Sequence, residues 1–283
     1  MTSIGHNGWL KCNLVADSMD NITEPFHIEF DCKPQVMPFQ DAADYTAKLI
    51  AEKYNNIHLF LSGGIDSEFV AKVLLRNKIP FTPVILDAEY NRPESWYAHK
   101  FCHENNIEPL VYMFTGSSGH HELVKSLCST AIKLKLPVNI SLINNVFAKI
   151  ISADAHTLNG FGEPFYNSTT FSQPMGETLE IADHDFFMET EYGDRHPGAF
   201  FTYTPELYSA LIKEIDFTAN TQIAKASLYG VLPRSKNYTH FFDMFPSKNI
   251  ELILHRAFST LKKDISKQMM VINRNVLLQK FST

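Results

Sequence analysis

The chain has 283 residues, of which 45% are hydrophobic and 12% aromatic, and this is enough to fill the core of one large or two modest domains. Its longest apolar runs are far shorter than the roughly 20 residues of a membrane span, and its N-terminus lacks the apolar segment of a signal peptide, so we expect a globular protein of the cytoplasm. The net charge of −6 argues against a nucleic-acid-binding surface over the whole molecule.

The first 37 residues alternate polar and apolar side chains, and this pattern predicts a small N-terminal β element. A helix is expected next, over residues 41–56, because apolar side chains recur there at helical spacing. The strands expected after it are residues 57–61, 81–87, 108–114 and 156–161, and the helices are residues 66–78, 93–106, 121–134 and 140–155. This alternation predicts an α/β fold over residues 38–165, a doubly wound parallel sheet covered on both faces.

The alternation of strands and helices ends near residue 165. A capped helix is expected over residues 204–215, with Pro205 at its first position, and the last 35 residues have a helical pattern. We therefore expect residues 166–283 to form a mainly helical C-terminal region that completes any site on the sheet.

The turn after the first strand of the expected sheet has the sequence Ser62-Gly63-Gly64-Ile65-Asp66-Ser67. In a parallel sheet, ligands bind beyond the carboxyl ends of the strands, where the next helix offers free backbone N–H groups. Two glycines would let the backbone approach an anion closely, and the two serines add hydroxyl donors. Asp66 can hold a divalent cation against phosphate oxygens. The pattern indicates a pyrophosphate site, although it is not a Walker A loop, because G-x-x-x-x-G-K-[ST] is absent and no lysine lies in the turn.

The same six residues resemble the S-G-G-x-D-S signature of the PP-loop, or N-type, ATP pyrophosphatases, which have a Rossmann-like fold of the adenine nucleotide alpha hydrolase type. Members of that superfamily cleave ATP between its α and β phosphates, adenylate a substrate and release pyrophosphate. The resemblance implies ATP and Mg²⁺ as cofactors. It also implies nucleotide binding by Ser62, Gly63, Gly64, Ile65 and Ser67, and a catalytic and metal-binding role for Asp66.

Two later stretches are similar to the same superfamily. The stretch "VILDAEYNRPES" places Leu86 and Asp87 where the family recognises adenine, and it also resembles a pattern of the sulfonucleotide reductases. The stretch "TLNGFGEPF" resembles a Gly-rich turn of the asparagine synthetases. That resemblance implies that Gly160 and Gly162 lie near the nucleotide and that Glu163 is a magnesium ligand.

A third stretch, "LYGVLPRSKNY", looks like a short form of a basic element of the asparagine synthetases. It implies that Arg234 and Lys236 are catalytic cations that meet the phosphates. The segment from residue 233 to the C-terminus carries nine Lys or Arg against three Asp or Glu, so contact with a nucleobase or nucleic acid through this segment is an alternative use of its charge.

The four cysteines form no pair with metal or redox spacing, and none follows Cys128, so we expect reduced structural thiols and little support for sulfur chemistry. The remaining function is an ATP-dependent ligase or amidating enzyme that forms AMP and pyrophosphate. Two alternatives stay open: a protein like the sulfonucleotide reductases, and a nucleotide-binding module without catalysis. The expected partners are ATP and an unidentified acceptor, with no membrane contact, and a homodimer is a further alternative that stays open.

Overall fold

The computed structural model describes residues 2–14, 26–30, 32–88, 92–114, 154–162, 165–166, 178–181, 198–215, 221–234 and 270–273. The helix expected over residues 121–134 lies outside these ranges, as does the helix expected over residues 140–155 except for its last two residues, which form a turn and a bend.

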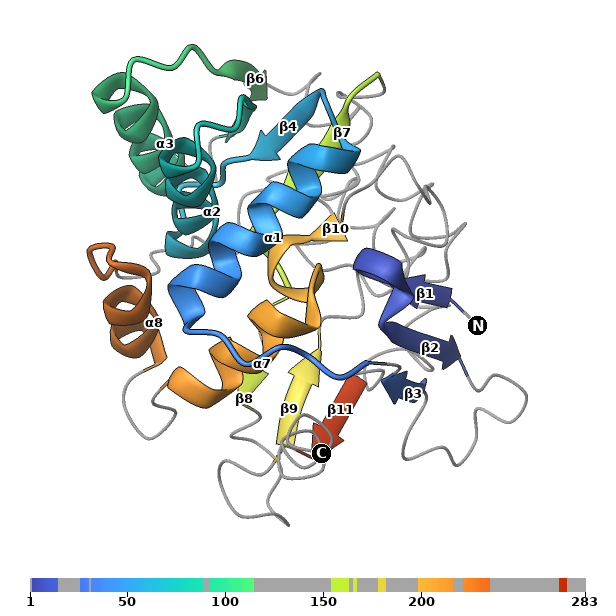
Figure 1. The fold of residues 1–283 in the computed structure, drawn as a ribbon. Coiled ribbons are helices and arrows are strands. Elements are labelled where there is room, and N and C mark those ends of the chain that lie inside the picture. Colours follow the sequence, from blue (N-terminus) through green and yellow to red (C-terminus); the bar gives the residue numbers. More distant parts are fainter. Residues whose placement is uncertain are drawn as a thin grey trace, which may run out of the picture.

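A five-stranded parallel sheet forms the centre of the described structure (Figure 1). In sheet order its strands are β10 (Gly198–Ala199), β7 (His156–Asn159), β4 (Ile57–Phe60), β5 (Thr82–Ala88) and β6 (Leu110–Phe114). The chain moves from β4 through β5 to β6 in one direction, whereas β7 and β10 lie on the other side of β4. The strand order therefore reverses between β4 and β7, which makes this the place where an open parallel sheet binds ligands. The prediction of a Rossmann-like, doubly wound α/β fold is confirmed.

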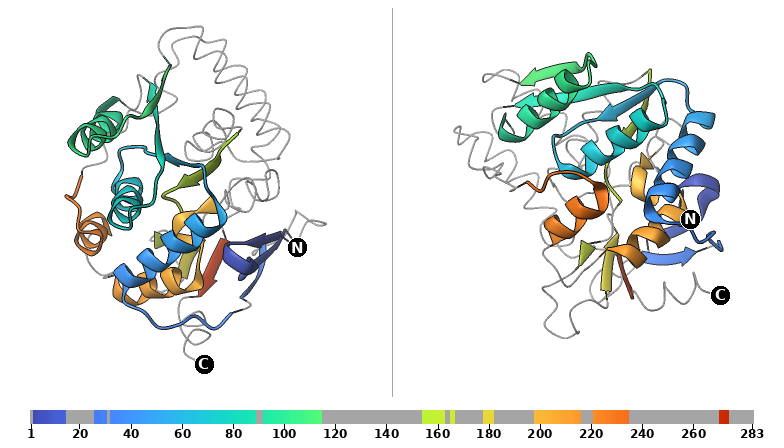
Figure 2. Two further views of the ribbon diagram at one scale, coloured as in Figure 1. Left: turned by 45° about the horizontal axis from the view of Figure 1, so that its top comes forward. Right: turned by 60° about the vertical axis from the view of Figure 1, so that its left-hand side comes forward.

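Five α-helices are described. They are α1 (Phe39–Lys53), α2 (Ile65–Arg76), α3 (Arg92–Glu104), α7 (Pro205–Glu214) and α8 (Thr221–Tyr229). Helix α2 connects β4 to β5, and α3 connects β5 to β6. The two helices lie on the same side of the sheet (Figure 2). This is expected, because both connections between parallel strands are right-handed and both move along the sheet in the same direction. Helix α1 packs against α2 and α7, and α8 packs against α2. No helix in these described ranges is long and apolar enough to cross a membrane.

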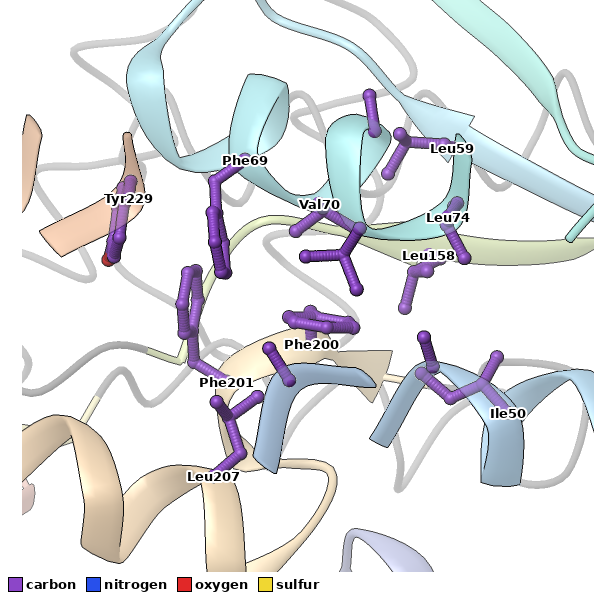
Figure 3. Packing of buried hydrophobic residues seen from close by; sticks show 14 of the residues in the cluster. Ile50, Leu59, Phe69, Val70, Leu74, Leu158, Phe200, Phe201, Leu207 and Tyr229 are labelled. Atoms are coloured by element: carbon purple, nitrogen blue, oxygen red, sulfur yellow. The ribbon is translucent and has the colours of Figure 1, made fainter. Parts of the chain in front are cut away.

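Aromatic side chains hold these helices together (Figure 3). The fully buried ring of Phe69 in α2 stacks on Phe39 of α1 at 5.2 Å and on Tyr229 of α8 at 4.5 Å between ring centroids. It also stacks at 5.9 Å on Phe201 of the short helix η3 (Phe200–Thr202). Aromatic pairs in such arrangements add about 0.5 to 1.5 kcal/mol each to the energy of burial. Helix α2, which follows the glycine turn, is thus packed against α1 from an earlier part of the chain and against η3 and α8 from a later part.

The N-terminal β element is a separate antiparallel sheet of β1 (Thr2–Ile4), β2 (Leu10–Leu14) and β3 (Phe26–Phe30), with the short helix η1 (His6–Gly8) between the first two strands. The buried Trp9 donates a hydrogen bond from Nε1 to the carbonyl oxygen of Thr202 at 2.9 Å. This contact fixes the sheet to η3, which follows β10, and the sheet predicted within the first 37 residues is confirmed.

The prediction for the C-terminal region is wrong at one segment. Residues 270–273 were expected to be helical, but they form β11 (Met270–Asn273), which pairs antiparallel with β9 (Thr178–Ile181). Strand β9 pairs in turn with β8 (Phe165–Tyr166). The partner strand of β11 lies about ninety residues earlier in the chain, so no local periodicity in the C-terminal sequence could reveal the pairing, and the β-branched Val271 and Ile272 suit a strand.

The start of α7 depends on Thr204, as its sequence predicts. The Thr204 hydroxyl accepts a hydrogen bond from the backbone N–H of Leu207 at 3.3 Å and lies 2.6 Å from the hydroxyl of Thr46 in α1, and both threonines are fully buried. We expect Thr204→Val to lower the free energy of unfolding by about 2 kcal/mol, because it removes the helix cap and leaves the Thr46 hydroxyl buried without this partner. Urea denaturation measures this. Thr46→Val should cost less, and the double variant should cost less than the sum; strictly additive losses would show that the two hydroxyls do not interact.

Candidate functional site

The glycine turn lies directly between β4 and α2. Helix α2 begins at Ile65 with Gly64 as its N-cap, and Gly64 has no side chain that could accept from the first amides of the helix. The Ser67 hydroxyl donates to the carbonyl oxygen of Gly64 at 3.1 Å and lies 3.1 Å from the Ser62 hydroxyl. The Gly64 N–H donates to that Ser62 hydroxyl at 3.3 Å. The hydroxyls of the two serines therefore hold the turn through contacts within it. The first backbone N–H groups of α2 lie at the N-terminus of the helix, which is the place where helices bind anions.

Gly63 fits this turn because it has no side chain. Its φ of +87° lies in the left-handed region, and a Cβ atom there would approach the carbonyl oxygen of Glu94 in α3 to 1.9 Å. The backbone of α3 thus lies directly against the turn. Only glycine combines this backbone conformation with this contact.

Gly160, which follows β7, lies against the other side of the same turn. A Cβ atom on Gly160 would be 2.7 Å from the backbone nitrogen of Ser67 and 2.8 Å from the carbonyl carbon of Asp66. The ends of β4 and β7 therefore meet at the point where the strand order reverses. Gly162 has a φ of +92° and faces Thr202 in η3 rather than the turn, because its Cβ would lie 2.8 Å from the Thr202 hydroxyl.

Asp66 has a cationic partner that the sequence analysis missed. Nζ of Lys225, in α8, lies 2.8 Å from Oδ1 of Asp66, and the side chains of Lys225 and Asp66 are 3% and 20% exposed. A lysine this deeply buried is uncommon unless it is paired. The only sequence signal was a lysine within the apolar stretch "IAKASLYGV", and no spacing rule connects that lysine to an aspartate far away in the chain.

Arg234 contacts the turn at the backbone of Gly63. Its Nη1 donates to the carbonyl oxygen of Gly63 and its Nη2 to Oε2 of Glu68 in α2. The guanidinium stacks on the ring of Tyr97 in α3, with Cζ 4.2 Å from the ring centroid. Lys72 also lies 2.9 Å from Glu68, so this carboxylate serves two cations.

Asp87 is the second-last residue of β5 and lies beside the start of α3. Ser95 donates from its hydroxyl to Oδ1 of Asp87 at 3.2 Å, and Nε2 of His99 lies 3.5 Å from Oδ2. Ser95 is buried, whereas Asp87 and His99 are partly exposed. The Leu86 side chain is buried in the core, so any contact of this residue with a ligand would come from its backbone.

Two of the residues singled out from the sequence, Glu163 and Lys236, lie outside the described residues. Within the described ranges, no three His, Cys, Asp or Glu side chains lie close enough together to hold a metal ion. Among the six residues of the described turn, Asp66 is the one that carries a carboxylate, and Glu68 in the first turn of α2 is paired with Arg234 and Lys72. A single carboxylate suits a magnesium ion that arrives with a nucleotide, because such ions are held mainly by phosphate oxygens and water.

The thiol of Cys102 is poorly suited to sulfur chemistry. Burial of this thiol in α3, and secondarily the nearby charge of Glu108, raise its pKa from 9.0 to about 11. The reactive species in thiol chemistry is the thiolate, which is scarce at neutral pH when the pKa is this high. Cys102 is therefore a structural thiol, as the sequence led us to expect.

No family model matches the chain, and no curated protein matches it in sequence. The chain is similar to several solved structures. NMN synthetase from Francisella tularensis is 14% identical over 82% of this chain and 96% of that one, with a TM-score of 0.35. NH3-dependent NAD synthetase from Campylobacter jejuni is 15% identical over 82% and 95%, with a TM-score of 0.34. Glutamine-dependent NAD+ synthetase from Acinetobacter baumannii, in complex with ADP, is 13% identical over 89% and 46%, with a TM-score of 0.36. At such TM-scores we draw no conclusion from the likeness, and the fold assignment rests on the strand order described above.

Proposed function

We propose that this protein is an ATP-dependent ligase or amidating enzyme that cleaves ATP to AMP and pyrophosphate while it adenylates an acceptor. The observation that carries this proposal is the position of the Ser62–Ser67 turn. It joins β4 to the N-terminus of α2 where the strand order reverses, and Gly160 from the end of β7 closes directly on it. The residues of the turn resemble the signature of the PP-loop ATP pyrophosphatases, and the strand-to-helix context is the one that this signature requires.

The proposed reaction has two steps. An acceptor oxygen, from a carboxylate or an amide-like group, attacks the α phosphorus of ATP, and the bond from that phosphorus to the bridging oxygen breaks. Pyrophosphate leaves with the bonding electrons. An amine or ammonia then attacks the adenylated carbon, AMP leaves, and the amine loses a proton to solvent.

The chain's own residues would act mainly by binding and orientation. The first amides of α2 and the hydroxyls of Ser62 and Ser67 would hold the phosphate chain, and the two hydroxyls are held by contacts within the turn. Fixed donors of this kind stabilise charge that develops on a leaving group without having to reorganise. Lys225 adds a buried positive charge beside the turn, next to Asp66.

The adenine would lie toward the end of β5. In the PP-loop family, which this sequence resembles, this strand end recognises adenine through backbone groups. The side chain of Leu86 is buried here, so only its backbone could contact a nucleotide. Asp87 is held by Ser95 and His99 and is close enough to the surface to meet a polar group of the nucleoside. Gly162 would act indirectly, by letting the chain after Gly160 pass close to η3.

A magnesium ion would neutralise charge on the phosphates when it is bound with ATP. Asp66 would hold it, with one oxygen on Lys225, and Glu163 is a second candidate ligand from outside the described residues. Lys236, which also lies outside the described residues, stays a candidate phosphate contact, and the basic C-terminal segment stays a candidate contact for an anionic acceptor. A homodimer also stays a proposal.

The products of ATP turnover test the proposed function. The protein is incubated with Mg²⁺ and with ATP labelled in the α or the γ phosphate, across a panel of carboxylic acids, amines and nucleic acids. We expect labelled AMP from the first substrate and labelled pyrophosphate from the second. Release of ADP and phosphate would overturn the assignment, and tight ATP binding without turnover on any acceptor would favour the non-catalytic module.

A further inference from the structure

The guanidinium of Arg234 lies between the glycine turn, α2 and α3. Its two terminal nitrogens are engaged with the Gly63 carbonyl oxygen and the Glu68 carboxylate, and one of its faces stacks on Tyr97. The side chain is 14% exposed, and that of Glu68 is 10% exposed. We propose that Arg234 is a positioning residue, which holds the Gly63 peptide from behind in the orientation that the turn needs to bind phosphate, rather than a direct contact of the phosphates. This inference rests on the proposed function.

The Gly63–Gly64 peptide is held at both ends. Its carbonyl oxygen accepts from Arg234, and its N–H, which points the opposite way in a trans peptide, donates to the Ser62 hydroxyl at 3.3 Å. Both contacts are needed because two consecutive glycines have more backbone freedom than any other pair of residues. Without Arg234, one end of this peptide loses its only contact from a charged donor among the described residues.

The charges around Arg234 support a role in positioning the Gly63 peptide rather than in direct contact with phosphate. Glu68 neutralises much of the guanidinium charge and is itself shared with Lys72 at 2.9 Å. A planar guanidinium suits this place, since it can donate to two acceptors in fixed directions while its face lies on an aromatic ring. Arg234 also lies just after α8, the helix that carries Lys225. Its contact with Gly63 therefore holds the end of α8 close to the glycine turn, where Lys225 pairs with Asp66.

A positioning residue and a direct phosphate contact differ in their kinetic signatures. If Arg234 orders the turn in advance, its loss weakens ATP binding in the ground state and the transition state equally, which raises KM and leaves kcat nearly unchanged. If it contacts pyrophosphate as charge develops, its loss lowers kcat more than it raises KM.

The experiment compares Arg234→Ala and Arg234→Lys with a control at the other end of α2. In the control, Arg76→Ala, the arginine removed pairs with Asp44 at 2.6 Å and ties α2 to α1, away from the turn. Hydrogen exchange of peptides covering residues 61–67, calorimetric ATP binding and steady-state kinetics are measured for each variant. We expect Arg234→Ala to speed exchange of the turn amides and to weaken ATP binding, each by about tenfold, with kcat changed less than threefold. Arg234→Lys should recover part of both losses, because lysine can donate to one of the two acceptors.

The outcomes separate this inference from the proposed function. Unchanged exchange of residues 61–67 in Arg234→Ala, or equal acceleration in Arg76→Ala, would overturn the positioning role. A loss of kcat with unchanged ATP affinity would also overturn it, because that result assigns Arg234 to the phosphates. If the unmodified protein binds no ATP, the proposed function fails, while the exchange measurement still decides whether Arg234 orders the turn.

Discussion

Gly63→Ala is expected to abolish ATP binding and to lower the free energy of unfolding by about 3 kcal/mol or more. A φ of +87° costs a residue with a side chain about 1 to 2 kcal/mol, and the new methyl group would collide with the carbonyl oxygen of Glu94. That oxygen belongs to the backbone of α3, so it cannot rotate away, and accommodating the methyl group requires the helix and the turn to separate. Calorimetric titration with ATP and urea denaturation measure the two effects.

The neighbouring glycine provides the matched control for stability. Gly64 has a φ of −73° and a ψ of 160°, which alanine adopts freely, and a Cβ atom there would meet only the Ser62 hydroxyl at an ordinary 3.4 Å. Gly64→Ala should therefore change the free energy of unfolding by less than about 1 kcal/mol. If the two alanine variants proved equally stable, α3 would not lie against the turn as described.

Lys225→Met is expected to lower the free energy of unfolding by about 3 kcal/mol, although methionine fills a similar volume. The substitution leaves the largely buried Asp66 carboxylate without the cation that now lies 2.8 Å away. Removing one partner of a buried ion pair costs about 3 to 5 kcal/mol, because the other charge stays behind. The partial exposure of Asp66 places this case at the lower end of that range. Urea denaturation at neutral pH measures the loss.

A double-mutant cycle separates the ion pair from packing. If the charge on Asp66 causes the loss, Asp66→Asn in the Lys225→Met background should restore part of the stability, with a coupling energy of at least about 1 kcal/mol. The same four proteins report on function, since Asp66→Asn should weaken magnesium-dependent ATP turnover in the presence of Lys225. Additive losses of stability would mean that Lys225 acts through its methylene chain alone.

Local sequence was sufficient to predict the elements on which the site is built. The strands β4, β5, β6 and β7 and the helices α1, α2, α3 and α7 lie where hydrophobic periodicity and capping residues placed them, to within a few residues. The glycine turn was also visible from sequence, because its position after a strand and before a helix follows from those same local patterns. Strand β10 was missed, since its two residues are too few to show any period.

Sequence alone thus determined the α/β alternation and the turn at which we propose that phosphate binds, since both depend on residues close together in the chain. The tertiary structure decided which distant residues meet that turn. Gly160 reaches it because β7 pairs beside β4, and Lys225 reaches Asp66 because α8 packs on α2. The same holds for Arg234, whose place behind Gly63 depends on α8 and α3 together. Contacts between residues this far apart depend on strand order and helix packing, and neither is encoded in any local period of the sequence.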